Sequence, residues 1–255
     1  MIASKLRLIE KRDLYKWGRL WELRFEAPGL DFQPGQFVNI SVDGRFLRRP
    51  VSVSDYENDI LSLIIQPIGE GTQKIINTPI GTYLDMLLPL GNCFSIPVTD
   101  EPKTILLVGG GVGYAPLVGL TRKLSAKTNI KVYAFFGFNT EKDIPLNHIY
   151  ELKEKGYQIE ISTLSGEIGY KGNVGEMIQE KIELNKITPS YFYTCGPMPM
   201  MTAISQILQI EGELSLEARM GCGFGACVGC TIKTKVGNRR ICKEGPVFKN
   251  SELWI

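Results

Sequence analysis

The chain has 255 residues, 44% of them hydrophobic, which is enough for two compact domains with real cores and an additional segment. Its 29 lysines and arginines nearly balance 27 aspartates and glutamates, so a net charge of +2 favours neither nucleic acid nor an anionic membrane as partner. The longest apolar runs have the length of strands, and the first residues lack the apolar core of a signal peptide. We therefore expect a cytoplasmic protein that binds no membrane and no nucleic acid.

Residues 1–100 carry the pattern of short strands separated by turns. Apolar and polar residues alternate through segments rich in β-branched residues, and Pro-Gly, Asp-Gly and Glu-Asn pairs separate them. The expected strands lie within residues 5–14, 20–29, 35–44, 48–58, 59–69 and 81–96. This pattern predicts an antiparallel β-barrel or sandwich. A helix is expected at 69–78, where Thr72 is well placed to start it and to leave outward-facing N–H groups for an anion.

After residue 100 the pattern changes, and apolar runs alternate with helical stretches. The expected strands are 104–110, 130–138, 157–163 and 190–196, and the expected helices are 114–128, 145–156, 173–183 and 199–212. Strands and helices that take turns predict a parallel sheet covered on both faces, and hence an α/β domain. We therefore divide the chain into a β domain at 1–100, an α/β domain at 101–212 and a small C-terminal segment at 213–255.

The single histidine of the chain, His148, lies in the helix expected at 145–156. We expect it to be a surface or half-buried helical residue. One histidine excludes a histidine-rich metal site, and its expected place on an amphipathic helix argues against a histidine-based catalytic triad. We assign no catalytic side chain, and expect a cofactor to carry any chemistry.

A glycine-rich turn follows the first strand of the α/β domain. Its glycines are Gly109, Gly110, Gly111 and Gly113. At the start of a helix, such a turn lets the backbone approach a pyrophosphate, although tight packing between strand and helix also needs glycine. The loop after the next strand offers only Glu141 and Asp143 as ribose-binding carboxylates and has no arginine for a 2′-phosphate, which favours NADH over NADPH.

Cys195, Gly196 and Pro197 follow the strand expected at 190–196, at the carboxyl edge of the sheet where ligands of such sheets bind. Cys195 alone is equally explained as a small buried residue before a turn. Because the glycine-rich turn lies at the same edge, we expect the three residues to contact nicotinamide.

In the β domain, Arg48 and Arg49 stand in tandem at the start of an expected strand. An arginine at an exposed strand edge is often merely solvated. However, Gln66 is followed by Gly71 and Thr72 at a helix start, which supplies donors for the other side of a diphosphate. The sequence thus indicates a second dinucleotide site.

Four cysteines near the end of the chain follow the spacing C-x4-C-x2-C-x11-C. They are Cys222, Cys227, Cys230 and Cys242. The first three have the plant-type spacing of a 2Fe-2S cluster, and glycines among them allow N–H groups to point at sulfur. A structural zinc site and free or disulfide-bonded thiols are the alternatives, and two upstream dinucleotide sites favour iron over zinc. A further cysteine, Cys93, is expected only to pack.

Several motifs together resemble the ferredoxin-NADP reductase superfamily: PGQFV at 34–38, RRPVSVS at 48–54, GEGT at 69–72, VGGGVGYAPL at 108–117 and YTCGPMPMM at 193–201. With ARMGCGFGACVGC and ICKEGPVF added, the whole chain resembles the electron-transfer subunits of the NAD-dependent, class 1B dihydroorotate dehydrogenases.

The resemblance implies an FAD-binding β-barrel, an NAD-binding α/β domain and a C-terminal 2Fe-2S segment. It implies that FAD is held by Arg49, Pro50, Val51, Ser52, Ile64, Ile65, Gln66, Gly71 and Thr72. It also implies an FMN-containing catalytic subunit as partner, two copies of each subunit, and electrons running from dihydroorotate through FMN, cluster and FAD to NAD in pyrimidine (UMP) biosynthesis.

Two alternatives to this function remain. One is a related flavin and iron-sulfur subunit that serves a sulfite reductase, a hydrogenase or a ferredoxin-NADP transhydrogenase. The other is a zinc-bearing interaction module without a redox role.

Overall fold

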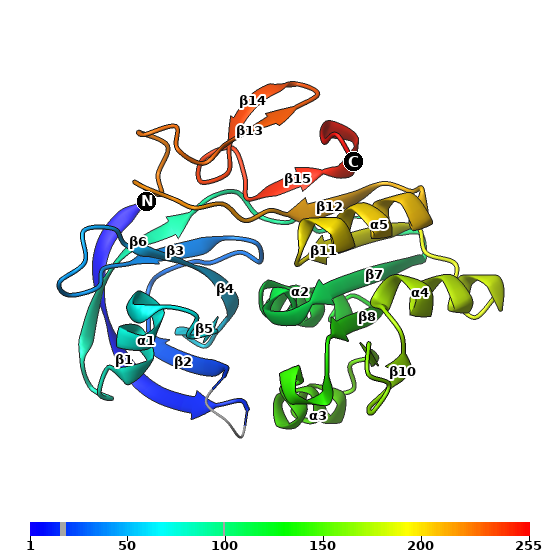
Figure 1. The fold of residues 1–255 in the computed structure, drawn as a ribbon, viewed down its shortest axis with the longest axis horizontal. Helices are drawn as coiled ribbons and strands as arrows, with labels where there is room; N and C mark the ends of the chain where they lie inside the picture. The colour runs from blue at the N-terminus through cyan, green and yellow to red at the C-terminus, as the bar shows by residue number, and fades with distance from the viewer. Residues whose placement is uncertain (16–18, 99) are drawn as a thin grey trace.

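Six antiparallel strands close into a barrel in the computed structural model, which describes residues 1–15, 19–98 and 100–255 (Figure 1). In chain order the strands are β1 (Ile2–Asp13), β2 (Trp21–Glu26), β3 (Phe37–Ile40), β4 (Arg49–Glu57), β5 (Ile60–Ile65) and β6 (Tyr83–Leu90). They pair in the order β1-β2-β5-β4-β3-β6. Alternation turns every second side chain inward, and Leu8, Leu23, Val38, Leu61 and Met86 are fully buried in the barrel. The predicted antiparallel barrel is confirmed.

The helix of the barrel domain, α1 (Glu70–Asn77), begins two residues before the predicted starting residue Thr72. Its N-cap is Gly69, whose N–H donates to Thr72 Oγ1 at 3.2 Å, while that hydroxyl donates to the carbonyl oxygen of Gly69 at 2.9 Å. The prediction that Thr72 starts the helix was wrong, because Thr72 caps the helix from its third position.

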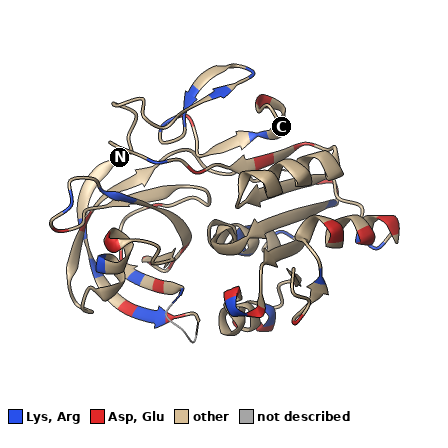
Figure 2. Cartoon of the chain, in the orientation of Figure 1, with Lys and Arg blue, Asp and Glu red and all other residues tan. Residues whose placement is uncertain are grey.

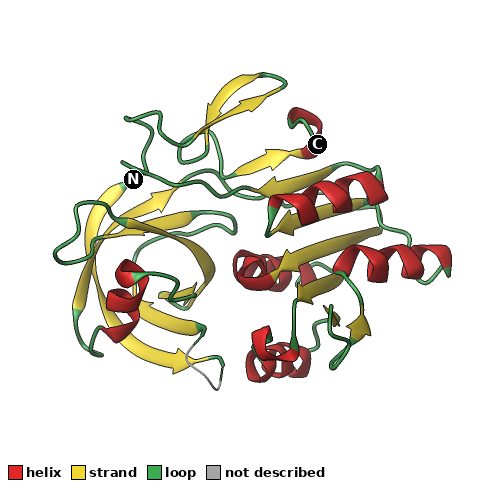
Figure 3. Cartoon of the chain, viewed as in Figure 1, coloured by secondary structure: helices red, strands yellow, loops and turns green. Residues whose placement is uncertain are grey.

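The rest of the fold is built around a seven-stranded sheet with helices on both faces (Figure 3). Its strands are β7 (Lys103–Gly110), β8 (Ile130–Phe138), β9 (Ile159–Thr163), β10 (Tyr170–Lys171), β11 (Tyr191–Cys195), β12 (Gly212–Ser215) and β15 (Val247–Lys249), in the order β10-β9-β8-β7-β11-β12-β15. The helices are α2 (Ala115–Ser125), α3 (Leu146–Glu154), α4 (Val174–Glu183) and α5 (Met198–Leu208).

Side chains of β7 alternate between two cores. Ile105 and Leu107 lie in the core with α2 and α3, whereas Leu106 and Val108 lie in the core with α4 and α5. Six of the seven strands run parallel, and only β15 is antiparallel to its neighbour β12. The predicted parallel sheet covered on both faces is confirmed. No helix in the described part of the chain is long and apolar enough to cross a membrane.

The C-terminal segment is fused to this sheet. Its strands β12 and β15 extend the sheet, and β13 (Thr231–Thr234) and β14 (Gly237–Arg240) form a separate hairpin. The helix predicted at 199–212 ends at Leu208, because Gln209 adopts a left-handed conformation and the chain turns into β12. Three short 3₁₀ turns complete the described elements: Gly111–Tyr114, Glu141–Asp143 and Asn250–Glu252.

Helix α2 packs directly on strand β4 and joins the barrel to the α/β domain. Ser54 donates a hydrogen bond to the carbonyl oxygen of Ala115 at 3.0 Å, and Asp55 pairs with Arg122. A Cβ on Gly119 would lie 2.9 Å from the backbone oxygen of Ser54, so only glycine allows this approach. Charged side chains of both signs are interspersed over both domains (Figure 2), in line with the small net charge.

Two sequence predictions about single residues were wrong. His148 is buried with 5% exposure, because α3 turns it inward where its Nδ1 shares a 3.0 Å hydrogen bond with Tyr114 Oη. Burial lowers the pKa of His148 to about 4, so the ring is neutral at neutral pH. Cys93 is exposed instead of packed, because the neighbouring Phe94 is the side chain that turns into the core.

Candidate functional site

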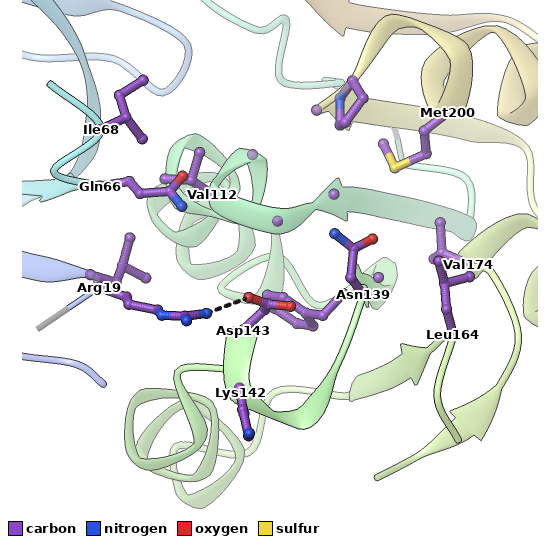
Figure 4. Close-up of a pocket in the computed structure, with 18 of the residues that line it drawn as sticks. Arg19, Gln66, Ile68, Val112, Asn139, Lys142, Asp143, Leu164, Val174 and Met200 are labelled. Carbon is purple, nitrogen blue, oxygen red and sulfur yellow. Dashed lines mark hydrogen bonds and ion pairs between the residues drawn. The ribbon is translucent and has the colours of Figure 1, made fainter. Parts of the chain in front are cut away.

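A cavity of about 880 Å³ lies between the barrel and the carboxyl edge of the sheet. The barrel contributes Gln66, Pro67 and Ile68, which follow β5, and Gln73 of α1. The sheet contributes residues at the ends of its parallel strands, among them Gly110, Gly137, Ser162 and Gly196. Figure 4 shows Gln66 and Ile68 on one side of this cavity and Asn139, Leu164, Val174 and Met200 on the other. Its place at the carboxyl edge is where dinucleotides bind on such sheets.

The glycine-rich turn forms part of the cavity wall. Gly110, Gly111 and Gly113 line the cavity, and Gly111 has a positive φ of 55°. Gly109 lies behind them, where a Cβ would meet the backbone of Tyr114 at 2.8 Å. A Cβ on Gly113 would overlap the carbonyl of Cys195. The turn therefore has glycine both for packing and for an open backbone surface toward the cavity.

The end of β11 lies beside this turn. Gly196 and Pro197 line the cavity, and a Cβ on Gly196 would approach the backbone nitrogen of Gly110 to 2.9 Å. Cys195 is 2% exposed, and burial raises the pKa of its thiol to about 12. Its thiol is therefore protonated at neutral pH, and of these three residues only Gly196 and Pro197 line the cavity.

The barrel residues predicted to hold a diphosphate meet at the start of β4. The guanidinium of Arg49 lies directly against Gly71, so the strand and the helix N-terminus come together as expected. Arg49 Nη1 donates to the carbonyl oxygen of Leu47 at 2.6 Å. Pro50, Val51 and Ser52 are partly exposed along the same strand.

The strand next to β4 carries the remaining predicted barrel residues. Ile64 and Ile65 are buried, and their side chains belong to the α/β core and the barrel core respectively. Only their backbone is available to a ligand. Gln66 is exposed and lines the cavity.

The four cysteines form two pairs. Cys230 Sγ lies 3.2 Å from Cys242 Sγ, and the N–H of Cys242 donates to Cys230 Sγ at 3.4 Å. In the other pair, the N–H of Cys222 donates to Cys227 Sγ and the N–H of Cys227 donates to Cys222 Sγ, both at 3.4 Å. Within residues 1–15, 19–98 and 100–255, no three metal-binding side chains converge on one ion position. Two thiol pairs match the donor set of a cluster with two irons, each of which takes two thiolates.

Backbone donors favour the thiolate form of Cys222, the first of the four cysteines. Desolvation opposes ionisation, but hydrogen bonds from the backbone N–H groups of Phe224 and Cys227 lower the pKa of Cys222 to about 6. Arg240 fixes the far side of the loop, since its Nη1 donates to the carbonyl oxygen of Gly225 at 2.6 Å. Of the four glycines among the cysteines, Gly223 and Gly225 have the positive φ that was expected, 79° and 93°, and these turns allow nearby amides to point at sulfur.

Sequence reasoning missed much of the cavity wall. Its other members include Tyr15, Arg19, Asn139, Lys142, Ser162, Asn173, Met198, Met200 and Glu217. The Ser162 hydroxyl is buried without a hydrogen-bond partner in the described part of the chain. Asp143, one of the two acidic candidates, lines the cavity and pairs with Arg19 at 3.5 Å, whereas Glu141 is exposed. No local pattern marks these residues, because they come together only through the order of the strands.

Two protein-family models match the chain. The model of the iron-sulfur cluster binding domain of dihydroorotate dehydrogenase B matches residues 217–254. The model of the oxidoreductase NAD-binding domain matches residues 107–206. The first match contains both thiol pairs and supports iron-sulfur over zinc, and the second contains most of the strands and helices around the cavity.

Curated relatives match almost the whole chain. The dihydroorotate dehydrogenase B (NAD(+)) electron transfer subunit of Caldanaerobacter subterraneus subsp. tengcongensis is 35% identical over 98% of this chain and 97% of its own length. The subunit of the same description from Fusobacterium nucleatum subsp. nucleatum is 36% identical over 87% of each chain.

Solved structures share the fold. An NADH-dependent reduced ferredoxin-NADP oxidoreductase, described for flavin-based electron bifurcation, has a TM-score of 0.83 at 22% identity and covers 98% of this chain and 89% of its own. Phthalate dioxygenase reductase, described as a modular structure for electron transfer from pyridine nucleotides to 2Fe-2S, has a TM-score of 0.66 at 16% identity, covering 91% and 87%.

Proposed function

Because this chain belongs to the family of dihydroorotate dehydrogenase B electron transfer subunits, we propose that it passes electrons between a catalytic subunit that oxidises dihydroorotate and NAD. The reaction belongs to de novo pyrimidine biosynthesis. The observation that carries the proposal is that the four cysteines form two pairs. They belong to the C-terminal segment, which extends the sheet beside the large cavity.

The cysteine pairs would hold the cluster. We assign Cys222 and Cys227 to one iron and Cys230 and Cys242 to the other, because each pair is already in contact. The N–H groups aimed at these sulfurs would stabilise the negative charge of a bound cluster. When bound, the flavin exchanges electron pairs with nicotinamide and single electrons with the cluster, which is the chemistry that this chain's residues do not themselves supply.

The start of β4 and the N-terminus of α1 would bind FAD. Arg49 would pair with the diphosphate, with Gly71 and Thr72 offering backbone N–H groups at the positive end of the helix. Pro50, Val51 and Ser52 would lie along the flavin, with the backbone of Ile64 and Ile65 and the amide of Gln66 completing the site.

The other side of the cavity would bind NAD. Gly110, Gly111 and Gly113 would approach its pyrophosphate, and Gly196 and Pro197 would face nicotinamide. Gly109 and Cys195 would support this wall from behind. No arginine follows β8 in residues 139–143, which supports NAD over NADP.

The partner would be an FMN-containing catalytic subunit, in a complex of two copies of each subunit. Next to the cysteines, Phe224 is 42% exposed and Val228 is 65% exposed, an apolar surface suited to contact with another protein. We also propose a cytoplasmic location, where thiols stay reduced, and the division into FAD-binding 1–100, NAD-binding 101–212 and cluster-binding 213–255.

Anaerobic titration of the purified chain with NADH tests the proposal. We expect flavin absorption, two irons per chain, and the EPR signal of a reduced 2Fe-2S cluster after NADH addition. A colourless protein with bound zinc would contradict the redox assignment. A protein that shows flavin and cluster absorption but exchanges electrons only with a sulfite reductase, hydrogenase or transhydrogenase partner would instead support the alternative of a related flavin and iron-sulfur subunit.

A further inference from the structure

One buried polar side chain of the barrel points away from the barrel core. Asn39 lies on β3 between Val38 and Ile40, which are both in the barrel core, so alternation turns Asn39 to the outer face. Its exposure is only 1%. A buried amide on an otherwise apolar strand needs hydrogen-bond partners, and those partners indicate what it does.

The partner of Asn39 is the first cysteine of the cluster loop. Asn39 Nδ2 donates to the carbonyl oxygen of Cys222 at 3.2 Å, across 183 positions of sequence. The next residue, Gly223, has a positive φ of 79° and passes so close that a Cβ would overlap the Asn39 amide. The loop is therefore held at two carbonyls, by Asn39 from the barrel and by Arg240 from the loop's own segment.

The same strand position faces the proposed flavin strand. Asn39 is the direct cross-strand partner of Pro50 on β4, so the two side chains share the outer face. Arg48 Nη1 donates to the backbone oxygen of Asn39 at 3.3 Å and pairs with Asp85 at 2.5 Å. Asn39 is thus the point where the loop that carries Cys222 meets the strand that would lie along the flavin.

One atom of this amide has no partner. Asn39 Oδ1 is buried and accepts no hydrogen bond from any residue in 1–15, 19–98 or 100–255. A buried acceptor without a partner destabilises the folded chain, so this amide contributes through its donor alone. Its donor side is what the structure uses.

We propose that Asn39 is a positioning residue that docks the Cys222 loop on the barrel and thereby fixes the cluster relative to the flavin. Asn39 would take no part in the chemistry of either cofactor. It acts through the carbonyl of Cys222, which sets where the first pair of thiols lies against β3 and β4. This inference rests on the proposed cluster ligands and flavin strand.

The test compares two asparagines whose side chains donate hydrogen bonds to different parts of the C-terminal segment. Asn39→Leu keeps the size and removes the donor to Cys222. Asn92→Leu is the control for a different part of the segment, because Asn92 Nδ2 donates to the carbonyl oxygens of Glu244 and Val247, at 3.2 and 2.7 Å, and its Oδ1 accepts from the N–H of Val247 at 2.9 Å. Hydrogen exchange of the full chain is measured at residues 220–228 and 244–248, and NADH-driven reduction of flavin and cluster is followed by stopped flow.

For Asn39→Leu we expect exchange at 220–228 to be about tenfold faster, the effect of one lost hydrogen bond on a docked loop, with 244–248 unchanged. We expect cluster reduction to slow while flavin reduction keeps its rate. Asn92→Leu should show faster exchange only at 244–248, and unchanged cluster reduction.

Unchanged exchange at 220–228 in Asn39→Leu, or equally slow cluster reduction in both variants, would overturn the positioning role. Asn39→Ala provides a second variant if the leucine does not fit. If the wild-type chain binds neither flavin nor cluster, the proposed function fails, and hydrogen exchange still decides whether Asn39 docks the loop.

Discussion

Arg122 of α2 and Asp55 of β4 form a two-pronged ion pair across the two large domains, with Nε and Nη2 of the arginine 2.7 to 3.2 Å from the carboxylate oxygens. Arg122 Nη2 also donates to the backbone oxygen of Tyr56 at 2.8 Å. The strand that would bind FAD is thereby fixed to the helix that follows the glycine-rich turn.

Arg122→Met should destabilise the chain, because it leaves the half-buried Asp55 carboxylate without its partner. We expect a loss of about 1–3 kcal/mol in the free energy of unfolding, measured by urea denaturation. Arg7→Met is the control, since Arg7 pairs with Glu26 at 3.6 Å on an exposed surface, where the loss should stay below about 1 kcal/mol. Equal losses in both variants would show that the interdomain ion pair stabilises the chain no more than an exposed ion pair does.

Gly71→Ala should weaken FAD binding without lowering stability. The new Cβ would occupy the position of the Arg49 guanidinium, and this flexible side chain would swing away from its place at the helix N-terminus. We expect FAD affinity, measured by fluorescence titration of the flavin-free protein, to fall about tenfold through loss of a charge-assisted contact. Gly69→Ala is the control, because Gly69 has extended backbone and nothing within 4 Å of a Cβ. Full FAD affinity in Gly71→Ala would contradict the placement of the diphosphate.

Serine at any one of the four paired cysteines should remove the cluster, because each iron would lose one of its two thiolates. The substitutions are Cys222→Ser, Cys227→Ser, Cys230→Ser and Cys242→Ser. Iron content and the EPR signal of the reduced protein measure the outcome. Cys93→Ser and Cys195→Ser are the controls and should keep the cluster, and an unchanged EPR signal in any of the four would refute that ligand.

His148 should make the chain less stable in mild acid. Burial first, then the charge of Arg12, lower its pKa from 6.5 to about 4, so between these values the unfolded chain binds a proton that the folded chain does not. Stability therefore falls as pH decreases through this range, by about 2 kcal/mol between pH 7 and pH 5. Urea unfolding at both pH values checks this, and His148→Gln should reduce the difference between the two pH values by about 2 kcal/mol. A wild-type chain with equal stability at the two pH values would show that the ring is protonated in the folded state.

The sequence allowed prediction of the elements whose patterns are local. Alternation over β1 to β6 predicted the barrel, and apolar runs between helices predicted most of the sheet. The spacing of the cysteines predicted the iron-sulfur segment. Strand β12 was missed for two reasons. Its four residues are all buried, so the sequence shows no alternation of apolar and polar residues. It also contains a glutamate, Glu213, which in a sequence indicates an exposed position although the side chain is buried in the structure.

Contacts between distant segments could not be predicted. Glu213 is buried because its carboxylate accepts hydrogen bonds from the N–H and hydroxyl of Ser95, at 2.9 and 2.5 Å, a partner 118 positions earlier. His148 was placed near the surface because nothing local indicates Tyr114 as its partner. Asn39 likewise acquires its role only when the barrel and the cysteine loop are brought together.

The most direct test of the electron-transfer account is dihydroorotate-dependent reduction of NAD by this chain purified together with the FMN-containing catalytic subunit. We predict that NADH and orotate form in equal amounts, that omission of this chain abolishes NADH formation, and that Cys230→Ser in this chain does the same. NADH formation by the catalytic subunit alone, or none with the fully loaded complex, would contradict the account.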